Sequence, residues 1–269
     1  MEFKKKQYDG PYEVSALELD IEGQLLRGLL YFPREYYIKP YKFIIYFHDF
    51  PQLFDLHQIV KNLEFLLDLG YSLLVFNFRG YRNSQGELSL HSQLQDALEL
   101  ARFIQLMAEK EIFKQQDINI VAHGFGCYIA LLLCSMRNFF NKILLISPIL
   151  NLKHLINQDM FVKTLDYINR YLPGYVHGIE NVPEFLTKTR RELTHNEFQI
   201  ENVLIKMNYN DIKIILGSKN KLINISELKS TFHKIPRLEI ASIDDMDHDW
   251  VEEESLCSFQ EEIISFFIS

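Results

Sequence analysis

Residues 121–126 read Val121-Ala122-His123-Gly124-Phe125-Gly126. A short apolar segment, residues 118–121, leads into this stretch, and a longer apolar segment, residues 128–136, follows it. A short apolar run before small residues is typical of a buried strand, and a longer run after them is typical of a helix. The stretch therefore predicts a tight turn from a strand into a helix, with Gly124 at its apex.

The chain on both sides of this turn alternates between two kinds of apolar pattern. Residues 12–20 and 24–32 flank Glu22-Gly23 and predict an antiparallel hairpin. Further segments predict buried strands at residues 42–47, 72–76, 118–121, 142–146, 212–216 and 237–243, and helices at 56–69, 94–108, 128–136, 226–233 and 253–267. Strands that alternate with helices of this length predict a mostly parallel sheet with right-handed crossovers.

The alternation breaks between residues 151 and 210. This segment is polar and helical in pattern, and it is interrupted at Pro173-Gly174 and at Pro183. We expect a single domain over residues 1–269 that carries residues 151–210 as a helical insertion. A helical excursion without any gating role is the alternative for this segment.

Composition limits the classes of partner. The chain has 269 residues, 48% of them apolar, and a net charge of −8 from 28 basic and 36 acidic residues. The only basic triplet is Lys4-Lys5-Lys6, so we expect no nucleic-acid partner, because phosphate binding needs a concentrated positive face. The N-terminal residues lack an apolar leader-like segment, and no run has the length of a membrane span. We therefore expect a cytoplasmic protein without a membrane-spanning segment.

Metal and cofactor motifs are not found in the sequence. The three cysteines have no C-x-x-C spacing, and the histidines have no spacing of the H-E-x-x-H kind, so the sequence predicts neither a metal site nor a disulfide framework. Gly124-x-Gly126 does not continue into a dinucleotide-binding loop, because Ile129 stands at the place of the third glycine. We expect no cofactor, and we expect Cys127 to be an inert core residue rather than a reactive thiol.

Four stretches resemble motifs of the α/β-hydrolase superfamily, in particular its capped lipase, esterase and serine-aminopeptidase-like members. The turn at Gly124 resembles the nucleophile elbow G-x-S-x-G. The other three are His48-Asp49-Phe50-Pro51-Gln52, which resembles an H-G-x-P-G-like oxyanion loop, residues 77–86 (NFRGYRNSQG), which resemble D-x-R-G-x-G-x-S-x-G, and Asp247-His248-Asp249-Trp250, which resembles the segment of the catalytic histidine. The four occur in the order of the family and between the expected strands.

The resemblance implies a fold and a set of site residues. It implies an eight-stranded, mostly parallel sheet with an N-terminal antiparallel hairpin, helices on both faces, and a helical cap at residues 151–210. It places Gly124 where the nucleophile stands, Asn220 where the acid stands, and His248 at the position of the catalytic histidine. His48, Asp49, Phe50, His123, Phe125 and Trp250 would surround the oxyanion hole and the pocket.

Most of the catalytic positions depart from the family pattern. Gly124 replaces the serine, Asn220 replaces the acid, and Asp49 and Gln52 stand where the oxyanion loop has glycines. An asparagine can orient an imidazole but cannot stabilise its charge, and a carboxylate opposes the stabilisation of an oxyanion. Glycine suits the strained apex of the elbow, where another residue costs roughly 1–3 kcal/mol. We expect no other side chain to have taken the place of the serine.

These departures favour a pseudoenzyme with a degenerate triad. The hypothesis is a non-catalytic pseudohydrolase that binds a small apolar or acyl-like ligand, or a protein partner through the cap. Phe50, Phe125 and Trp250 would line the pocket, and His248 would be a remnant, hydrogen-bonded to Asn220 or to a neighbouring carboxylate. The alternatives are an active hydrolase-fold enzyme that uses His248 in non-standard chemistry, and an inactivated variant of a serine ester or amide hydrolase.

Overall fold

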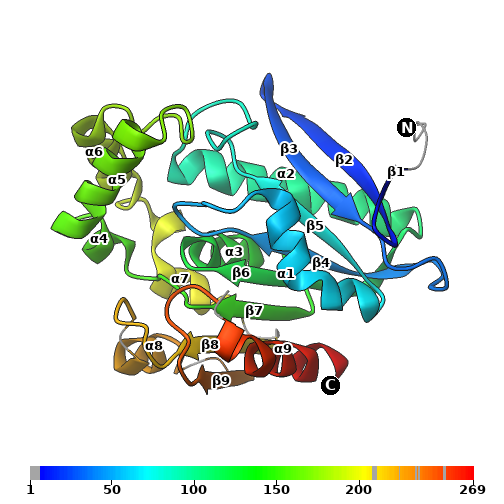
Figure 1. Ribbon diagram of the computed structural model, residues 1–269. Helices are drawn as coiled ribbons and strands as arrows, with labels where there is room; N and C mark the ends of the chain where they lie inside the picture. Colours follow the sequence, from blue (N-terminus) through cyan, green and yellow to red (C-terminus); the bar gives the residue numbers. More distant parts are fainter. Residues whose placement is uncertain (1–6, 208–210, 224, 234, 236, 251–252) are drawn as a thin grey trace.

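The computed structural model describes residues 7–207, 211–223, 225–233, 235, 237–250 and 253–269. Its centre is a sheet of nine strands in the order β1-β2-β3-β5-β4-β6-β7-β8-β9 (Figure 1). The strands are β1 (Gln7–Asp9), β2 (Tyr12–Ile21), β3 (Gln24–Tyr31), β4 (Tyr41–Phe47), β5 (Tyr71–Asn77), β6 (Phe113–His123), β7 (Lys142–Ile146), β8 (Asp211–Gly217) and β9 (Leu238–Ile243). The mostly parallel α/β sheet predicted from the sequence is confirmed.

The first three strands form the antiparallel part of the sheet. Strands β2 and β3 pair around the predicted turn, where Glu22 and Gly23 have φ of 55° and 79°. Strand β3 is antiparallel to β5, and from β5 onward all neighbours are parallel. The described part of the sheet has nine strands instead of the expected eight. The additional strand is β1, whose three exposed residues are too few to show an apolar pattern.

Helices cover both faces of the sheet. On one face, α1 (Leu56–Asp68) and α9 (Glu253–Ile268) pack against alternate strand residues such as Ile44 and Leu144. On the other face, α2 (Leu90–Glu109) and α3 (Phe125–Met136) pack against the intervening residues, such as Phe43 and Ile45, and α8 (Ile225–Thr231) adds Leu228 to this core. Because successive strand residues point to opposite faces, each parallel strand contributes to both apolar cores.

Between β7 and β8 the chain forms a group of short helices. They are α4 (Leu152–Leu155), α5 (Asp159–Tyr171), α6 (Val182–Glu192), the 3₁₀ helix η1 (Asn196–Phe198) and α7 (Ile200–Leu204). Figure 1 shows α4, α5 and α6 grouped to one side of the sheet, whereas α7 lies beside α3. The insertion is tied to the body of the protein where the Glu192 carboxylate accepts a hydrogen bond of 3.1 Å from the backbone of Leu90. Pro183 lies in the first turn of α6, where it removes no helical hydrogen bond.

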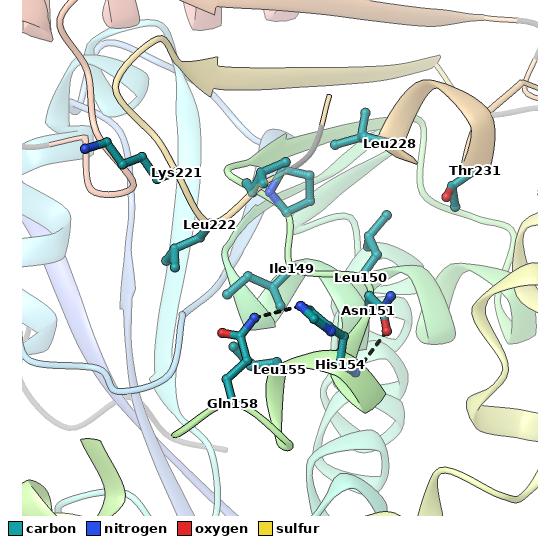
Figure 2. Close-up of a pocket in the computed structure, with 12 residues that line it drawn as sticks. Ile149, Leu150, Asn151, His154, Leu155, Gln158, Lys221, Leu222, Leu228 and Thr231 are labelled. Carbon is teal, nitrogen blue, oxygen red and sulfur yellow. Dashed lines mark hydrogen bonds between the residues drawn. The ribbon is translucent and has the colours of Figure 1, made fainter. Parts of the chain in front are cut away.

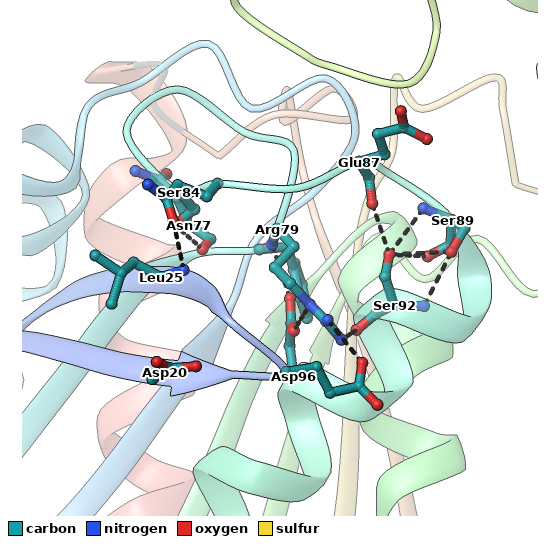
Figure 3. Close-up of polar contacts among 12 residues, drawn as sticks. Asp20, Leu25, Asn77, Arg79, Ser84, Glu87, Ser89, Ser92 and Asp96 are labelled. Carbon is teal, nitrogen blue, oxygen red and sulfur yellow. Dashed lines mark hydrogen bonds and ion pairs between the residues drawn. The ribbon is translucent and has the colours of Figure 1, made fainter.

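A buried ion pair fixes the loop that follows β5 (Figure 3). The backbone N–H of Arg79 and its Nε donate to the Asp96 carboxylate at 2.7 and 2.5 Å, and its Nη2 donates to the carbonyl of Ser92 at 3.1 Å. Asp96 belongs to α2, and its side chain is fully buried. The loop formed by residues 77–86 is therefore held against α2 by a buried hydrogen-bonded pair, and the Arg79 guanidinium also reaches the exposed Glu22 carboxylate at 3.3 Å.

Of the helices in the described part of the chain, none combines the length and the apolar character that crossing a bilayer requires.

Candidate functional site

The turn at Gly124 connects the end of β6 to the start of α3, as the sequence predicts. Gly124 has φ of 49° and ψ of −115°, a region that a residue with a side chain adopts only at a cost. Gly126 is required for a different reason. A Cβ at this position would lie 2.4 and 2.5 Å from the carbonyl oxygens of Phe47 and His48. The two glycines therefore allow α3 to start directly against the end of β4.

The carboxylate of Asp49 occupies the space above Gly124. A Cβ built on Gly124 would lie 2.1 Å from both Cγ and Oδ1 of Asp49. The Oδ1 atom accepts a hydrogen bond of 2.5 Å from the backbone N–H of Phe125, and Oδ2 lies 2.8 Å from Nε2 of His248. The prediction that no side chain has taken the place of the serine is therefore wrong. Asp49 can reach this place because glycine leaves it empty of side-chain atoms.

Asp49 and His248 stabilise each other's charges. Burial opposes ionisation of Asp49, but the hydrogen bond from His248 and the nearby imidazole of His123 outweigh it, so the pKa of Asp49 is lowered. Burial also opposes the imidazolium of His248, but the hydrogen bond and the charge of Asp49 raise its pKa above the ordinary value. The His248 side chain is only 15% exposed and the Asp49 side chain 11%. The pair therefore forms a largely buried ionic contact at the centre of the site.

Asn220 determines which nitrogen of His248 carries a proton. The backbone N–H of Leu222 donates to Oδ1 of Asn220 at 2.9 Å, which directs the Asn220 amino group toward Ser147 Oγ at 3.1 Å and His248 Nδ1 at 3.3 Å. An amino group can only donate, so Nδ1 of the neutral His248 imidazole accepts from it, whereas the imidazolium, which carries a proton on both nitrogens, cannot make this contact. The proton of the neutral imidazole then lies on Nε2, and Nε2 also carries a proton in the imidazolium. In both charge states Nε2 donates to Asp49.

His48 and His123 have structural contacts inside the site. Nδ1 of His48 donates to the backbone carbonyl of Asp49 at 2.8 Å, and Nε2 accepts from the backbone N–H of Phe78 at 3.2 Å. Burial lowers the pKa of His48 to about 4, so this histidine links two loops as a neutral ring. Nε2 of His123 lies 3.0 Å from the carbonyl oxygen of His248. Burial lowers the pKa of His123 as well.

The Asp49, His123 and His248 side chains also form a cluster of potential metal ligands. One ligating atom from each lies within 4.8 Å of the others. The three residues are separated by 74 and 125 positions, so a search for local spacing such as H-E-x-x-H does not detect them. The fold brings them together from the loop after β4, the end of β6 and the loop after β9.

Phe50 and Phe125 line a small apolar cavity. The cavity lies between these two residues, the start of α2 and the inserted helices, and its volume of about 30 Å³ leaves room for one or two water molecules. Phe161 of α5 packs on Phe50 with ring centroids 5.6 Å apart. The remaining lining residues are Leu88, Ser89, Leu90, Gln93, Leu152, Leu155, Ile156, Phe185 and Thr189.

Trp250 lies outside this cavity. Its side chain is buried in the core on the α1 and α9 side of the sheet, where it stacks on Phe259 with ring centroids 5.0 Å apart. Phe50 and Phe125 pack against the core on the other face, so the indole and the cavity lie on opposite faces of the sheet. Cys127 is fully buried, and burial raises its thiol pKa well above the ordinary value. The expectation of an inert core cysteine is therefore confirmed.

A larger cavity opens beside Asn220 and the ends of β7 and β8 (Figure 2). Its volume is about 560 Å³, and its walls come from residues 148–151, α4, residues 221–223 and α8. Figure 2 shows the imidazole of His154 hydrogen-bonded to the Gln158 amide, at 2.8 Å. Leu155 lines both this cavity and the small apolar one. The inserted helices therefore lie between the small apolar cavity and the larger cavity, whose walls are partly polar.

Two residues of the site have no counterpart in the sequence interpretation. Ser147, which has φ of 47°, is fully buried and accepts a hydrogen bond from the amide of Asn220. The amide nitrogen and oxygen of Gln93 make no hydrogen bond of regular geometry within the described residues, although Gln93 lines the small cavity. Ser147 directly follows a predicted strand, and that position was the only available signal. Gln93 gave none, because it occupies an ordinary helical position.

Comparison with known proteins places the chain in a family. Residues 43–192 match the family described as alpha/beta hydrolase fold. A search of curated proteins found no match. The family match, together with the sheet order and the turn at Gly124, agrees with the resemblance seen in the sequence.

Solved structures with the same fold include several esterases. An esterase of Pyrococcus furiosus is 18% identical with a TM-score of 0.66, and the alignment covers 95% of this chain and 89% of the other. Acetyl xylan esterase 1 from a Thermoanaerobacterium species is 14% identical with a TM-score of 0.66, with 98% and 86% covered. Est1E from Butyrivibrio proteoclasticus is 16% identical with a TM-score of 0.65, with 93% and 99% covered. At these identities the likeness concerns the fold alone.

Proposed function

This chain belongs to the alpha/beta hydrolase fold family, and from that premise we propose that it is a non-catalytic member that binds a small apolar or acyl-like ligand. One observation carries the proposal. The Asp49 carboxylate occupies the place of the missing nucleophile and contacts both the Phe125 N–H and His248 Nε2. The groups that would serve a serine nucleophile are thus engaged by a side chain of the protein itself.

Two electrostatic features support the absence of serine-type hydrolysis. A negative charge on Asp49 beside the Phe125 N–H would repel the oxyanion that develops on a substrate carbonyl. In addition, His248 presents a protonated Nε2, so it offers no lone pair toward Gly124. Removal of the triad serine alone typically lowers turnover about a millionfold. Here the oxyanion hole and the base are compromised as well.

The contact between Asp49 and Gly124 also bears on the origin of the glycine. A serine at position 124 would place its Cβ 2.1 Å from Cγ of Asp49, so the two side chains are incompatible in this arrangement. A recent replacement of a catalytic serine would leave a neighbourhood still shaped for that serine. Asp49 also stands where the family pattern has a glycine, so more than one catalytic position departs from the pattern, which supports long-standing loss over an inactivated variant of an active hydrolase.

The cavity between Phe50 and Phe125 supports the ligand-binding part of the proposal. Its walls are almost entirely apolar, and half of them belong to the inserted helices, which we propose act as a cap. A ligand larger than two water molecules requires these helices to move outward. The larger cavity of about 560 Å³ has the size of a small-molecule site and shares Leu155 with the closed space. We propose that the ligand places its polar end there.

Hydrolysis assays test the non-catalytic part. The purified protein would be incubated with p-nitrophenyl acetate, butyrate and octanoate beside His248→Ala as the matched control. We expect the two proteins to release p-nitrophenol at the same background rate. Turnover by the unchanged protein that disappears in His248→Ala would refute the proposal and favour an enzyme that uses His248 in non-standard chemistry.

Ligand binding is tested by displacement of a fluorescent fatty-acid analogue with octanoate and decanoate. Phe125→Ala should weaken binding about tenfold, since a contact worth about 1.4 kcal/mol corresponds to that factor. Phe139→Ala is the control, because Phe139 is a partly buried aromatic residue that stacks on Phe140 away from the cavity. Absence of displaceable binding, or equal weakening by both variants, would contradict a ligand site at Phe125.

A protein partner that binds the inserted helices is a second candidate. Met160, Tyr167 and Tyr171 of α5 are 68%, 58% and 58% exposed, and their spacing of seven and four residues places them on one face of the helix. A second copy of the chain is the partner that can be tested first, by sedimentation velocity at increasing concentration. Serine at all three positions should abolish association while Phe125→Ala preserves it. A protein that stays monomeric throughout would exclude self-association through this face.

A further inference from the structure

We propose that Asp49, His123 and His248 form a binding site for a divalent transition-metal ion of the zinc class. The proposal concerns metal binding alone. It does not depend on whether the protein binds an apolar ligand, and a metal-binding measurement can fail without affecting the outcome of the ligand measurements.

The donor atoms of the three side chains already lie close together. One ligating atom from each of the three side chains lies within 4.8 Å of the other two, and Asp49 Oδ2 and His248 Nε2 are 2.8 Å apart. Two ligands of a tetrahedral zinc ion with bonds of 2.0–2.1 Å are about 3.3 Å apart. Small rotations of the side chains are therefore enough to bring all three atoms to bonding distance, and the ion would replace the proton between Asp49 and His248.

Neighbouring groups already orient the donor atoms. The backbone N–H of Phe125 holds Oδ1 of Asp49 at 2.5 Å and leaves Oδ2 directed at His248. Nε2 of His123 lies 3.0 Å from the carbonyl oxygen of His248, which links the two histidines. Hydrogen bonds of this kind orient ligands in natural metal sites and contribute to their affinity.

The identity of the donors selects the class of ion. Two imidazoles and one carboxylate suit zinc, iron, cobalt and nickel, whereas magnesium and calcium prefer oxygen ligands. Three protein ligands leave at least one coordination position for water or a small ligand. The His123 side chain is 6% exposed, while Asp49 and His248 retain 11% and 15%, so solvent reaches one side of the cluster.

The surrounding charges favour a cation. Asp49 contributes one negative charge inside the cluster, and the Asp249 carboxylate lies 3.9 Å from Nε2 of His123. Lys219, on the neighbouring loop, pairs with Asp245 at 3.2 Å. Two histidines that are neutral when they bind a metal therefore sit beside carboxylates, which compensate the charge of a divalent ion.

Asn220 gives the proposal a specific second variant. When His248 binds a metal through Nε2, its Nδ1 carries the proton and needs an acceptor, whereas Asn220 now presents its amino group. Metal binding therefore requires the side-chain amide of Asn220 to turn over. The backbone N–H of the exposed Leu222 then loses its hydrogen bond to Oδ1 of Asn220. An aspartate at position 220 would accept the Nδ1 proton directly. Asn220→Asp should therefore bind the metal more tightly than the unchanged protein.

The experiment is calorimetric titration of chelator-treated, full-length protein with ZnCl₂, with MgCl₂ as the control ion and CoCl₂ for a visible absorption spectrum. We expect one zinc ion per chain. Asp49→Asn, His123→Gln and His248→Gln should each weaken zinc binding at least tenfold, and Asn220→Asp should tighten it about tenfold. His177→Gln is the matched control, because His177 forms an exposed pair with Glu180 at 3.4 Å and should leave the affinity unchanged.

Each remaining outcome overturns the proposal. These outcomes are no zinc binding by the unchanged protein, zinc binding that the three ligand variants retain, and weakening by His177→Gln alone, which would locate the ion at the surface. Circular dichroism checks that every variant is folded. If a ligand variant unfolds, the site is tested by the zinc affinity of Asn220→Asp and by the absorption spectrum of the unchanged protein with cobalt. An unchanged affinity together with a spectrum of hydrated cobalt would then refute the site.

Discussion

Oδ2 of Asp49 lies 2.8 Å from Nε2 of His248, although the two residues are 199 positions apart in the chain. Oδ1 of the same carboxylate accepts the backbone N–H of Phe125, the residue that follows the glycine at the elbow. Asp49 therefore joins the oxyanion loop, the elbow and the histidine loop through one carboxylate. Because its charge is stabilised by His248, this carboxylate forms a structural contact that joins three segments of the chain.

The first prediction concerns Gly124→Ser. Serine alone should not create a hydrolase, because its Cβ would collide with Asp49 and its backbone would be strained. The free energy of unfolding, measured with urea, should fall by at least about 1–3 kcal/mol, which is the typical cost of such strain.

Asp49→Gly combined with Gly124→Ser should recover part of that loss, since it removes the collision. Adding Asn220→Asp would restore the third member of a triad, and only this triple variant should hydrolyse p-nitrophenyl acetate above background. A stable Gly124→Ser single variant would show that Asp49 moves aside easily, contrary to the tight contact described above.

The second prediction concerns the imidazole of His248 in Asp49→Asn. The hydrogen bond and charge of Asp49 raise the pKa of His248 against the effect of burial. Without that charge, only the weaker effects of Asp249 and Asp247 oppose burial, so the pKa of His248 should fall below that of the unchanged protein. NMR titration of the histidine ring signals measures this shift, with His248→Gln to assign the resonance. An unchanged pKa would mean that Asp49 does not control the charge of His248.

The third prediction is a loss of stability in acid that originates from His48. Burial lowers the pKa of His48 to about 4 in the folded state, whereas an unfolded histidine has a pKa of about 6.5. Between these two values the unfolded state binds the additional proton, so stability falls as the pH falls through this window. The full difference corresponds to roughly 3 kcal/mol at the acid end.

Urea unfolding between pH 7 and pH 4 tests this expectation. The variant His48→Gln lacks the titrating group, and its stability should depend less steeply on pH by about that amount. Equal pH dependence of the two proteins would contradict the prediction and would indicate that the pKa of His48 is not lowered in the folded state.

The fourth prediction concerns the ion pair between Arg79 and Asp96 shown in Figure 3. Both side chains are nearly or fully buried. Asp96→Ala would leave the buried guanidinium with only the exposed Glu22 carboxylate at 3.3 Å and the Ser92 carbonyl as partners, so the free energy of unfolding should fall by up to about 3–5 kcal/mol, the typical cost of breaking a buried pair. Glu99→Ala is the control on the same helix, because the pair between Glu99 and Arg102 is exposed and should contribute at most about 1 kcal/mol. Similar effects of the two variants on the free energy of unfolding would contradict the role of burial.

Much of the fold can be predicted from local patterns. The hairpin around Glu22 and Gly23, the parallel strands and the turn at Gly124 were all found where the apolar spacing and the glycines place them. Boundaries differ by a few residues, and α2 begins at Leu90 rather than at residue 94, because Ser89 caps it with a hydrogen bond to the backbone of Ser92. Short exposed elements such as β1 escape prediction, since they bury no side chains.

The site could be predicted only in part. The positions of Gly124, Asn220 and His248 follow from the order of motifs along the chain, and the structure brings these residues together around Asp49. Trp250 was expected in the pocket but lies in the opposite core. Its direction depends on how the last loop passes from the sheet to α9, and a motif contains no information about that path.

The amino-acid sequence by itself determined the α/β architecture and the identity of the residues at positions 124 and 220, because apolar periodicity, glycine positions and single residues are local properties. Only the tertiary structure decided what fills the site. Asp49 reaches Gly124 and His248, and His123 joins them, because separate loops converge at the ends of the parallel strands. Contacts between side chains so far apart in the chain depend on the packed geometry of the whole domain.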